Sequence, residues 1–391
     1  MSTERDHLLP SDSQGAASWH PSLNTARALA CLWAVLLEAN RPTLGRAEEL
    51  FGLGSVDWWL CNLQAALMWW HVPLFVMTSG YFLLRDENGE GALVVPLSRT
   101  TGNEWGMAFY RRYVLYLMLP ALLWAALYLA WDWQLEGDPA TWKDVLHQLL
   151  QGSPNLFFLV VIVGLYLFAP LLRQTSASSS GRLTLTFGAL YTLLWVIDYG
   201  VSCYFDKWSV STAAQPLWYL GYFVMGYGYR LLHERIQRYR WAMLTGMILV
   251  QCAFLGSKYC AAAMKLPGGR PGYPYAHSFF SVYFYVVVSL AFPLLAPVSS
   301  RPVQTVSSAS YGIYLVHIFF FDVSNRLLPL GNVAPPATPA LGLLQGMVVF
   351  AASLAIVVLV KWIPVVRLLV CEGDLGLAPR TTGACGGETQ S

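Results

Sequence analysis

The sequence predicts an all-α polytopic membrane protein with about ten transmembrane helices. Two observations lead to this fold class. Hydrophobic residues make up 56% of the 391 residues and charged residues only 12%, whereas a soluble globule of this length carries more charge on its surface. The apolar residues also gather in long stretches, which is the pattern of membrane-spanning helices.

Ten apolar stretches reach the length of about 18 residues that a spanning helix needs. They cover roughly residues 23–40, 58–84, 111–132, 155–172, 183–202, 215–232, 239–256, 277–298, 308–327 and 341–369. An even number of spans places both termini on one side of the membrane. Of the 24 Lys and Arg residues, 16 lie in the termini and loops of that side, so the positive-inside rule predicts cytoplasmic termini.

Three regions follow from this pattern. Residues 1–22 are polar and predict a cytoplasmic N-terminal segment, residues 23–370 form one membrane domain, and the Gly/Thr-rich residues 371–391 predict a disordered cytoplasmic tail. The first segment contains no apolar core before a cleavage site, so we expect the first span to direct membrane insertion. Residues 139–152 have apolar residues at helical spacing and predict an amphipathic helix on the outer face.

Composition also excludes several functions. The formal net charge of +2 gives no reason to expect nucleic acid or an acidic partner, and the lipid bilayer is the partner that hydropathy indicates. The seven cysteines have neither the spacing of a zinc site nor that of a disulfide framework. Nucleotide-binding loops, HExxH and GxSxG are absent from the sequence. We therefore expect no metal and no permanently bound cofactor.

Glu38 stands in the stretch VLLEANRP, near the end of the first apolar run. A carboxylate at the centre of a spanning helix costs about 2.5–3.5 kcal/mol, so this residue needs a partner or a function. Arg27 lies eleven residues earlier. Eleven helical residues at about 100° each return to within about 20° of the starting direction and rise about 16 Å. Arg27 and Glu38 therefore share a helix face and can line one cavity without pairing.

Six segments form a recognisable series along the chain. They are Asp57–Leu84 with its VPxFxMxSG core, Ala108–Tyr128, Asn155–Arg173, Trp218–Tyr227, Ser310–His317 and Lys361–Val370. Together they resemble the acyltransferase-3 family of integral membrane O-acyltransferases, closest to the branch that includes the enterobacterial common antigen O-acetyltransferase. The resemblance covers about residues 22–370 and implies an acyltransferase-3-like helical bundle.

The family resemblance also implies an activity. It predicts transfer of an acetyl or related short acyl group from cytoplasmic acyl-CoA, with acetyl-CoA as the usual donor, to a hydroxyl of a surface or exported carbohydrate. The acceptor could be a lipid-linked glycan, and the expected location is a bacterial inner membrane. These expectations come from the resemblance and not from composition.

The first helix departs from the family pattern. The family has an arginine, ten residues and then a histidine that is thought to act as base or proton relay, whereas this chain has Arg27, ten residues and Glu38. Tyr116 replaces a second family arginine, and Asn155 and Phe157 replace a His and a Trp. The chain is therefore either a divergent enzyme or a catalytically silent or transport-type member that binds an acyl donor or lipid-linked glycan.

Glu38 has three interpretations. It can be a general base whose basicity is raised by burial among apolar residues. It can be a structural residue that reaches interfacial water beside Asn40, Arg41 and Pro42. It can also be the charge partner of an arginine on another helix.

His71, in WWHVPLF, offers an alternative imidazole for catalysis, or a hydrogen-bonded structural histidine. His317 lies in a matched segment and can serve packing or anchoring. Arg111 and Arg112 begin the third span, either as positive-inside anchors or as a clamp for the phosphates of CoA. The candidate catalytic residues are thus Glu38, Arg27 and His71, and the candidate donor-binding residues are Arg111 and Arg112.

Overall fold

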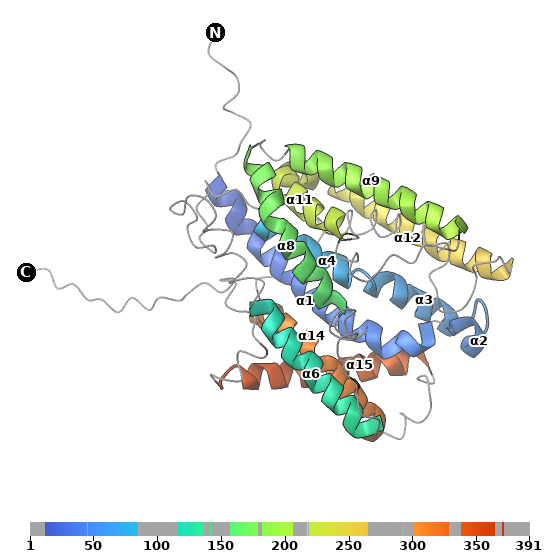
Figure 1. Cartoon of the computed structure of the whole chain (residues 1–391). Coiled ribbons are helices and arrows are strands. Elements are labelled where there is room, and N and C mark those ends of the chain that lie inside the picture. Colours follow the sequence, from blue (N-terminus) through green and yellow to red (C-terminus); the bar gives the residue numbers. More distant parts are fainter. Residues whose placement is uncertain are drawn as a thin grey trace, which may run out of the picture.

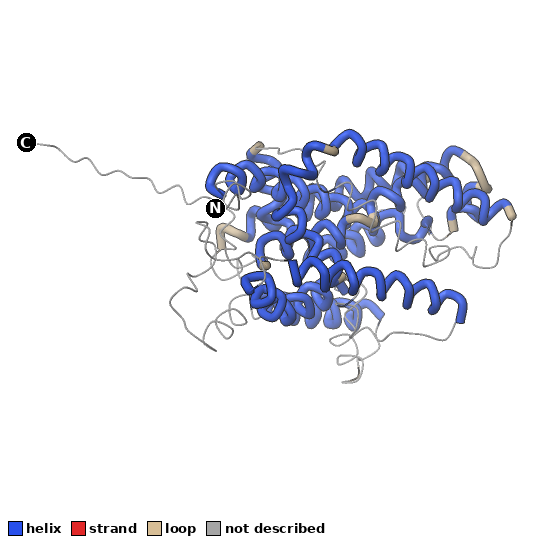
Figure 2. Tube along the Cα trace, turned by 90° about the horizontal axis from the view of Figure 1, so that it is seen from above, coloured by secondary structure: helices blue, strands red, loops and turns tan. Residues whose placement is uncertain are grey.

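The computed structural model describes residues 12–44, 46–84, 116–136, 157–178, 182–205, 219–264, 300–327 and 338–363, together with Thr141, Leu217, Phe292 and Val370. Within these ranges all regular secondary structure is helical (Figure 2). The all-α prediction is therefore confirmed for the described residues.

The helices are labelled in Figure 1. They are α1 (Asp12–Leu44), α2 (Ala47–Phe51), α3 (Val56–Met68), α4 (His71–Leu83), α6 (Tyr116–Glu136), α8 (Phe157–Ser178), α9 (Arg182–Phe205), α11 (Leu220–Arg238), α12 (Arg240–Ala263), α14 (Arg301–Leu327) and α15 (Pro339–Val360). Nine of the ten predicted spans coincide with these helices. The other, 277–298, lies outside the described residues except for Phe292.

The second predicted span is interrupted between α3 and α4. The interruption falls at Trp69 and Trp70, just before Pro73. Proline lacks the N–H that would bond the carbonyl of the residue four positions earlier, and its ring crowds that carbonyl. Pro73 is accepted in the first turn of α4, where an unpaired backbone nitrogen is normal. The break makes His71 the first residue of a new helix.

Four helical segments in the described ranges are long and apolar enough to cross a membrane. They are Val56–Leu83, Arg240–Cys260, Arg301–Asn325 and Pro339–Val360. Large apolar side chains are exposed along α9, α12 and α15, for example Leu190, Leu249 and Leu344. Apolar side chains on the outside of a bundle are typical of helices that meet lipid. The larger count of ten spans stays a prediction.

Helix α1 runs parallel to α14 and antiparallel to α15. Ser307 bonds Asn24 and Arg27 bonds Ser310, whereas Gly342 lies against Asn40. The start of α1, the start of α14 and the end of α15 therefore lie at the same end of the bundle (Figure 1). We call this the inner end and the opposite one the outer end, because charge predicts that the inner end is cytoplasmic. The membrane side itself stays a prediction.

Helices α4 and α11 come into direct backbone contact in the core. A Cβ atom added to Gly80 would overlap the Phe223 carbonyl, and one added to Gly226 would overlap the Met77 carbonyl. Phe223 and Met77 are completely buried. Small residues allow two membrane helices to approach in this way, because lipid supplies no hydrophobic drive for their association. This contact fixes the position of α4, which carries His71.

Candidate functional site

Arg27 lies in the inner half of α1, in the interface with α14. Its side chain is only 8% exposed, and Nη2 donates a hydrogen bond to Ser310 Oγ at 3.3 Å. Ser310 Oγ donates to the Ser307 carbonyl oxygen, and Ser307 Oγ donates to Asn24 Oδ1 at 3.0 Å. We call Asn24, Arg27, Ser307 and Ser310 the arginine–serine cluster. A guanidinium held in one orientation suits recognition of a carboxylate or phosphate.

Glu38 lies in the outer half of α1 and pairs with Arg41, one turn later. Arg41 Nη1 donates to Glu38 Oε1 at 3.0 Å and to Oε2 at 3.1 Å. The Glu38 and Arg41 side chains are 26% and 52% exposed. The partner of Glu38 is therefore an arginine of its own helix, and both carboxylate oxygens accept from it.

His71 and His317 have the same local geometry on different helices. His71 Nδ1 lies 2.8 Å from the Met68 carbonyl oxygen, and His317 Nδ1 lies 2.7 Å from the Tyr314 carbonyl oxygen. A carbonyl oxygen can only accept, so each Nδ1 carries a proton. In the neutral ring Nε2 then presents a lone pair. Each histidine is thus held in the tautomer that a general base requires.

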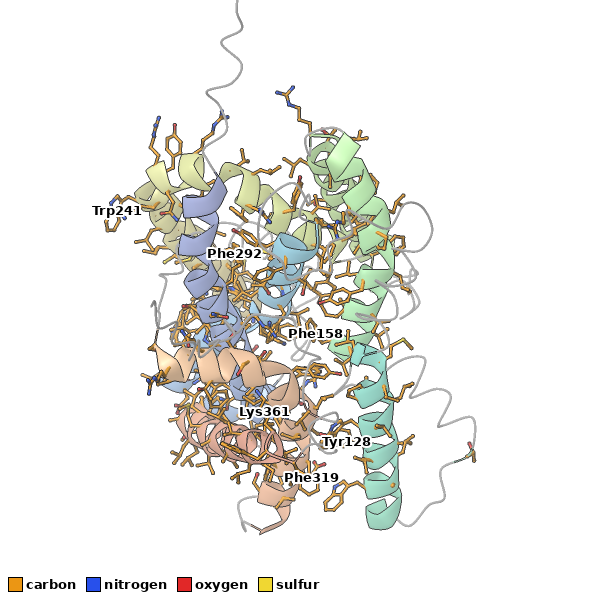
Figure 3. All side chains as sticks on the ribbon, turned by 90° about the vertical axis from the view of Figure 1, so that its left-hand side faces the viewer. Tyr128, Phe158, Trp241, Phe292, Phe319 and Lys361 are labelled. Atoms are coloured by element: carbon orange, nitrogen blue, oxygen red, sulfur yellow. The ribbon has the colours of Figure 1, made fainter. Side chains whose placement is uncertain are left out.

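Tyr314 lies beside His317 and connects α14 to α8. Its ring centroid lies 5.5 Å from that of His317, and its hydroxyl accepts a hydrogen bond from the backbone N–H of Phe158 at 3.3 Å. Phe158 is in the first turn of α8, where backbone N–H groups have no partner within the helix. Tyr128 of α6 holds α14 from another side, because its hydroxyl accepts from the Phe319 N–H at 3.3 Å (Figure 3).

The polar groups around the histidines come from α1, α4 and α14. His71 lies within range of electrostatic interaction with His317 and Arg41, and Tyr314 within range of Glu38 and Arg41. We call Glu38, Arg41, His71, Tyr314 and His317 the histidine cluster. Ionisable groups inside a membrane bundle are costly and mark functional sites. The histidine cluster is therefore the best-supported candidate for chemistry in the described part of the chain.

The structure does not join Arg27 to Glu38. Arg27 contacts Ser310 toward the inner end and Glu38 contacts Arg41 toward the outer end, in keeping with their predicted separation along α1. Arg111 and Arg112 lie outside the described residues, so their donor-binding role stays a prediction. In the described ranges no three His, Cys, Asp or Glu side chains could hold a metal ion.

Sequence reasoning did not identify Tyr314, or that His71 lies within electrostatic range of His317. One signal was present, because Tyr314 and His317 stand three residues apart in SYGIYLVH and so lie on one face of a helix. The approach of His71 had no such signal, since α4 and α14 are more than 200 positions apart in the sequence.

These observations define a class of protein. It is a bundle of apolar helices that carries ionisable side chains in two places, the arginine–serine cluster toward the inner end and the histidine cluster toward the outer end. The family model of the acyltransferase domain called acyltransferase-3 matches residues 20–363. Because the match covers most of the chain, the chain belongs to the acyltransferase-3 family of membrane acyltransferases. Searches of curated proteins and of solved structures gave no match.

Proposed function

We propose that the protein is a membrane O-acyltransferase that moves an acetyl or related short acyl group from cytoplasmic acyl-CoA to a hydroxyl of a surface or exported carbohydrate. Family membership supports acyl transfer. The resemblance of Asp57–Leu84 to the enterobacterial common antigen branch supports the acetyl donor and the carbohydrate acceptor. The observation that carries the proposal is the histidine cluster, in which His71 is held with Nε2 as a base.

In this proposal His71 is the general base. Its Nε2 takes the proton of the acceptor hydroxyl while the oxygen attacks the carbonyl carbon of the thioester. The C–S bond then breaks, and the CoA thiolate takes the proton back from the imidazolium. The hydrogen bond from Nδ1 to the Met68 carbonyl keeps the ring oriented and stabilises the imidazolium.

Glu38 is less suited to the same task. Both of its oxygens accept from Arg41 Nη1, so this pair must break before the carboxylate can take a proton from a substrate. Arg41 also lies within electrostatic range of His71. A fixed cation there would stabilise the oxyanion that forms when the hydroxyl attacks. In the proposal Glu38 therefore orients Arg41.

The arginine–serine cluster would serve the donor. Arg27 is anchored by Ser310 toward the predicted cytoplasmic end, where acyl-CoA would enter. About 16 Å of helix separates Arg27 from Glu38, so an elongated donor could touch the arginine–serine cluster and place its thioester at the histidine cluster. Arg111 and Arg112 would hold the phosphates of CoA.

The test supplies radiolabelled acetyl-CoA to membranes from the cells that produce the protein. We expect labelled surface carbohydrate and release of CoA, both lost in a deletion strain and restored by the wild-type gene. A first comparison of surface carbohydrate from the two strains identifies the acceptor. If membranes that contain this acceptor bind acetyl-CoA without releasing CoA, the protein is the silent or transport-type member. The replacement of the family histidine by Glu38 is the observation that favours this second function.

A further inference from the structure

The turn between α11 and α12 carries a concentrated positive charge. It lies toward the inner end, because at the other end of α12 Tyr259 stacks on Trp59, beside the outer end of α1. Arg235, Arg238 and Arg240 are all exposed there. In the described part of the chain none of the three forms an ion pair with an acidic side chain. Arg235 and Arg238 stand three residues apart and so lie on one face of α11. The three guanidinium groups therefore present a multivalent cationic surface.

Favourable interaction with the ends of the helices explains only some of these arginines. Arg235 and Arg238 occupy the last turn of α11, where a cation interacts favourably with the carbonyl end of the helix. Arg240 is the first residue of α12, where a cation is unfavourable, and the first turn of α12 contains no acidic residue. Interaction with the helix ends does not explain the position of Arg240, and its guanidinium is exposed to an external anion.

Exposed aromatic rings accompany the arginines. Tyr239 and Trp241 are 62% and 68% exposed, and the Arg240 guanidinium lies 5.3 Å from the centre of the Trp241 ring. Trp241 projects from the edge of the bundle (Figure 3). Tyr and Trp rings favour the headgroup level of a bilayer. Rings and arginines at one level indicate a ligand that lies at the membrane surface.

The face of α12 below Trp241 is apolar. Ile248 and Leu249, seven and eight residues later, are 51% and 63% exposed and fall on the same side of the helix. Only 11% of the most apolar stretch of α12 is buried inside the bundle, whereas 72% of the corresponding stretch of Val56–Leu83 is buried. A ligand that fits this surface has an anionic head at the arginines and an apolar tail along α12.

We propose that the α11–α12 turn retains an anionic phospholipid, with its phosphate among Arg235, Arg238 and Arg240 and its chains along the exposed face of α12. Charge complementarity and the continuous apolar face favour this occupant over a soluble polyanion, which would leave the apolar face unused. The proposal does not depend on catalysis. It goes beyond the positive-inside rule, which concerns orientation and not retention of a lipid.

Native mass spectrometry of the purified full-length protein tests this, with phosphatidylglycerol as probe and phosphatidylcholine as neutral control. We expect stronger retention of phosphatidylglycerol, weakened by salt. A basic residue near an anionic headgroup contributes about fivefold. The triple variant R235Q/R238Q/R240Q should therefore bind phosphatidylglycerol on the order of 100-fold more weakly, and the matched triple Lys variant should retain most binding.

The control is Arg46→Gln, which removes an exposed arginine near the outer end and should leave retention unchanged. Equal retention of the two lipids by the wild type overturns the proposal and needs no variant. Wild-type retention in the folded triple Gln variant also overturns it. Displacement of phosphatidylglycerol by free coenzyme A at equal concentration would assign the arginines to the soluble donor and overturn the lipid assignment.

Discussion

The substitution His71→Asn distinguishes two roles of this residue, that of a catalytic base and that of a structural hydrogen-bond donor. The Asn amide nitrogen takes the place of Nδ1 and can still donate to the Met68 carbonyl, while the nitrogen that would accept the substrate proton is lost. General-base catalysis contributes about 10²- to 10⁴-fold, so transfer should fall by that factor. A structural role predicts a small effect, because the hydrogen bond worth about 1 kcal/mol is kept.

Glu38→Gln is the matched comparison. The Glu38–Arg41 pair is partly exposed and lies within one helix, and pairs of this kind contribute about 0.3–0.5 kcal/mol. If Glu38 only orients Arg41, the Glu38→Gln variant should transfer the acyl group at a rate within about tenfold of wild type. A tenfold change corresponds to about 1.4 kcal/mol in activation free energy. Glu38→His in the His71→Asn background should restore some transfer, because it recreates the family arrangement on α1.

The assay measures CoA release and labelled carbohydrate from acetyl-CoA in membranes that contain the acceptor, normalised to the amount of folded protein by fluorescence-detected size-exclusion chromatography. The reasoning fails if His71→Asn is as active as wild type at normal abundance. It also fails if Glu38→Gln loses 10²-fold or more while His71→Asn does not, since the carboxylate would then be the base.

Three further predictions concern packing, donor binding and topology. Gly80→Ala should lower the free energy of unfolding by about 1–3 kcal/mol because its Cβ would overlap the Phe223 carbonyl, whereas Gly256→Ala, which faces open space, should not lower the melting temperature. Arg27→Lys keeps the charge but loses the planar fork, and we expect at least a tenfold loss of transfer; full activity in Arg27→Ala at normal abundance would remove its proposed role. An impermeant maleimide should not label Cys385, or a cysteine placed at Pro10, in intact cells, and labelling of either from outside would contradict cytoplasmic termini.

Much of the helical framework could be predicted from hydropathy alone. The apolar stretches 308–327 and 341–369 correspond to α14 and α15 because a backbone in lipid must satisfy its own hydrogen bonds, and a helix does so locally. The ends were harder to predict. Helix α15 stops at Val360, although the predicted span continues to residue 369. Pro364 has no N–H to donate to the Val360 carbonyl four positions earlier, so the helix cannot continue regularly through it.

The candidate site was only partly predictable. Arg27 and Glu38 stood out because charges are rare in apolar runs, and their shared helix face followed from helix periodicity. The hydrogen bond that fixes the tautomer of His71 depends on where α3 ends. Pro73 indicates a break in the helix near this point, but it does not specify the orientation of the His71 ring. The pairing of Glu38 with Arg41 depends on the rotamer of Arg41, which no pattern in the sequence specifies.

The sequence by itself determined the class of this protein, the positions of most helices, the family resemblance and the departure at Glu38. Each is a local property, set by hydropathy over about 18 residues or by the spacing of residues on one helix. The tertiary structure decided which distant side chains share a space. It placed Arg27 against Ser310, and Tyr314 of α14 against Phe158 of α8, across long stretches of chain. Such neighbours depend on how helices pack, and close contacts such as Gly80 against Phe223 set that packing through shape rather than through any periodic pattern.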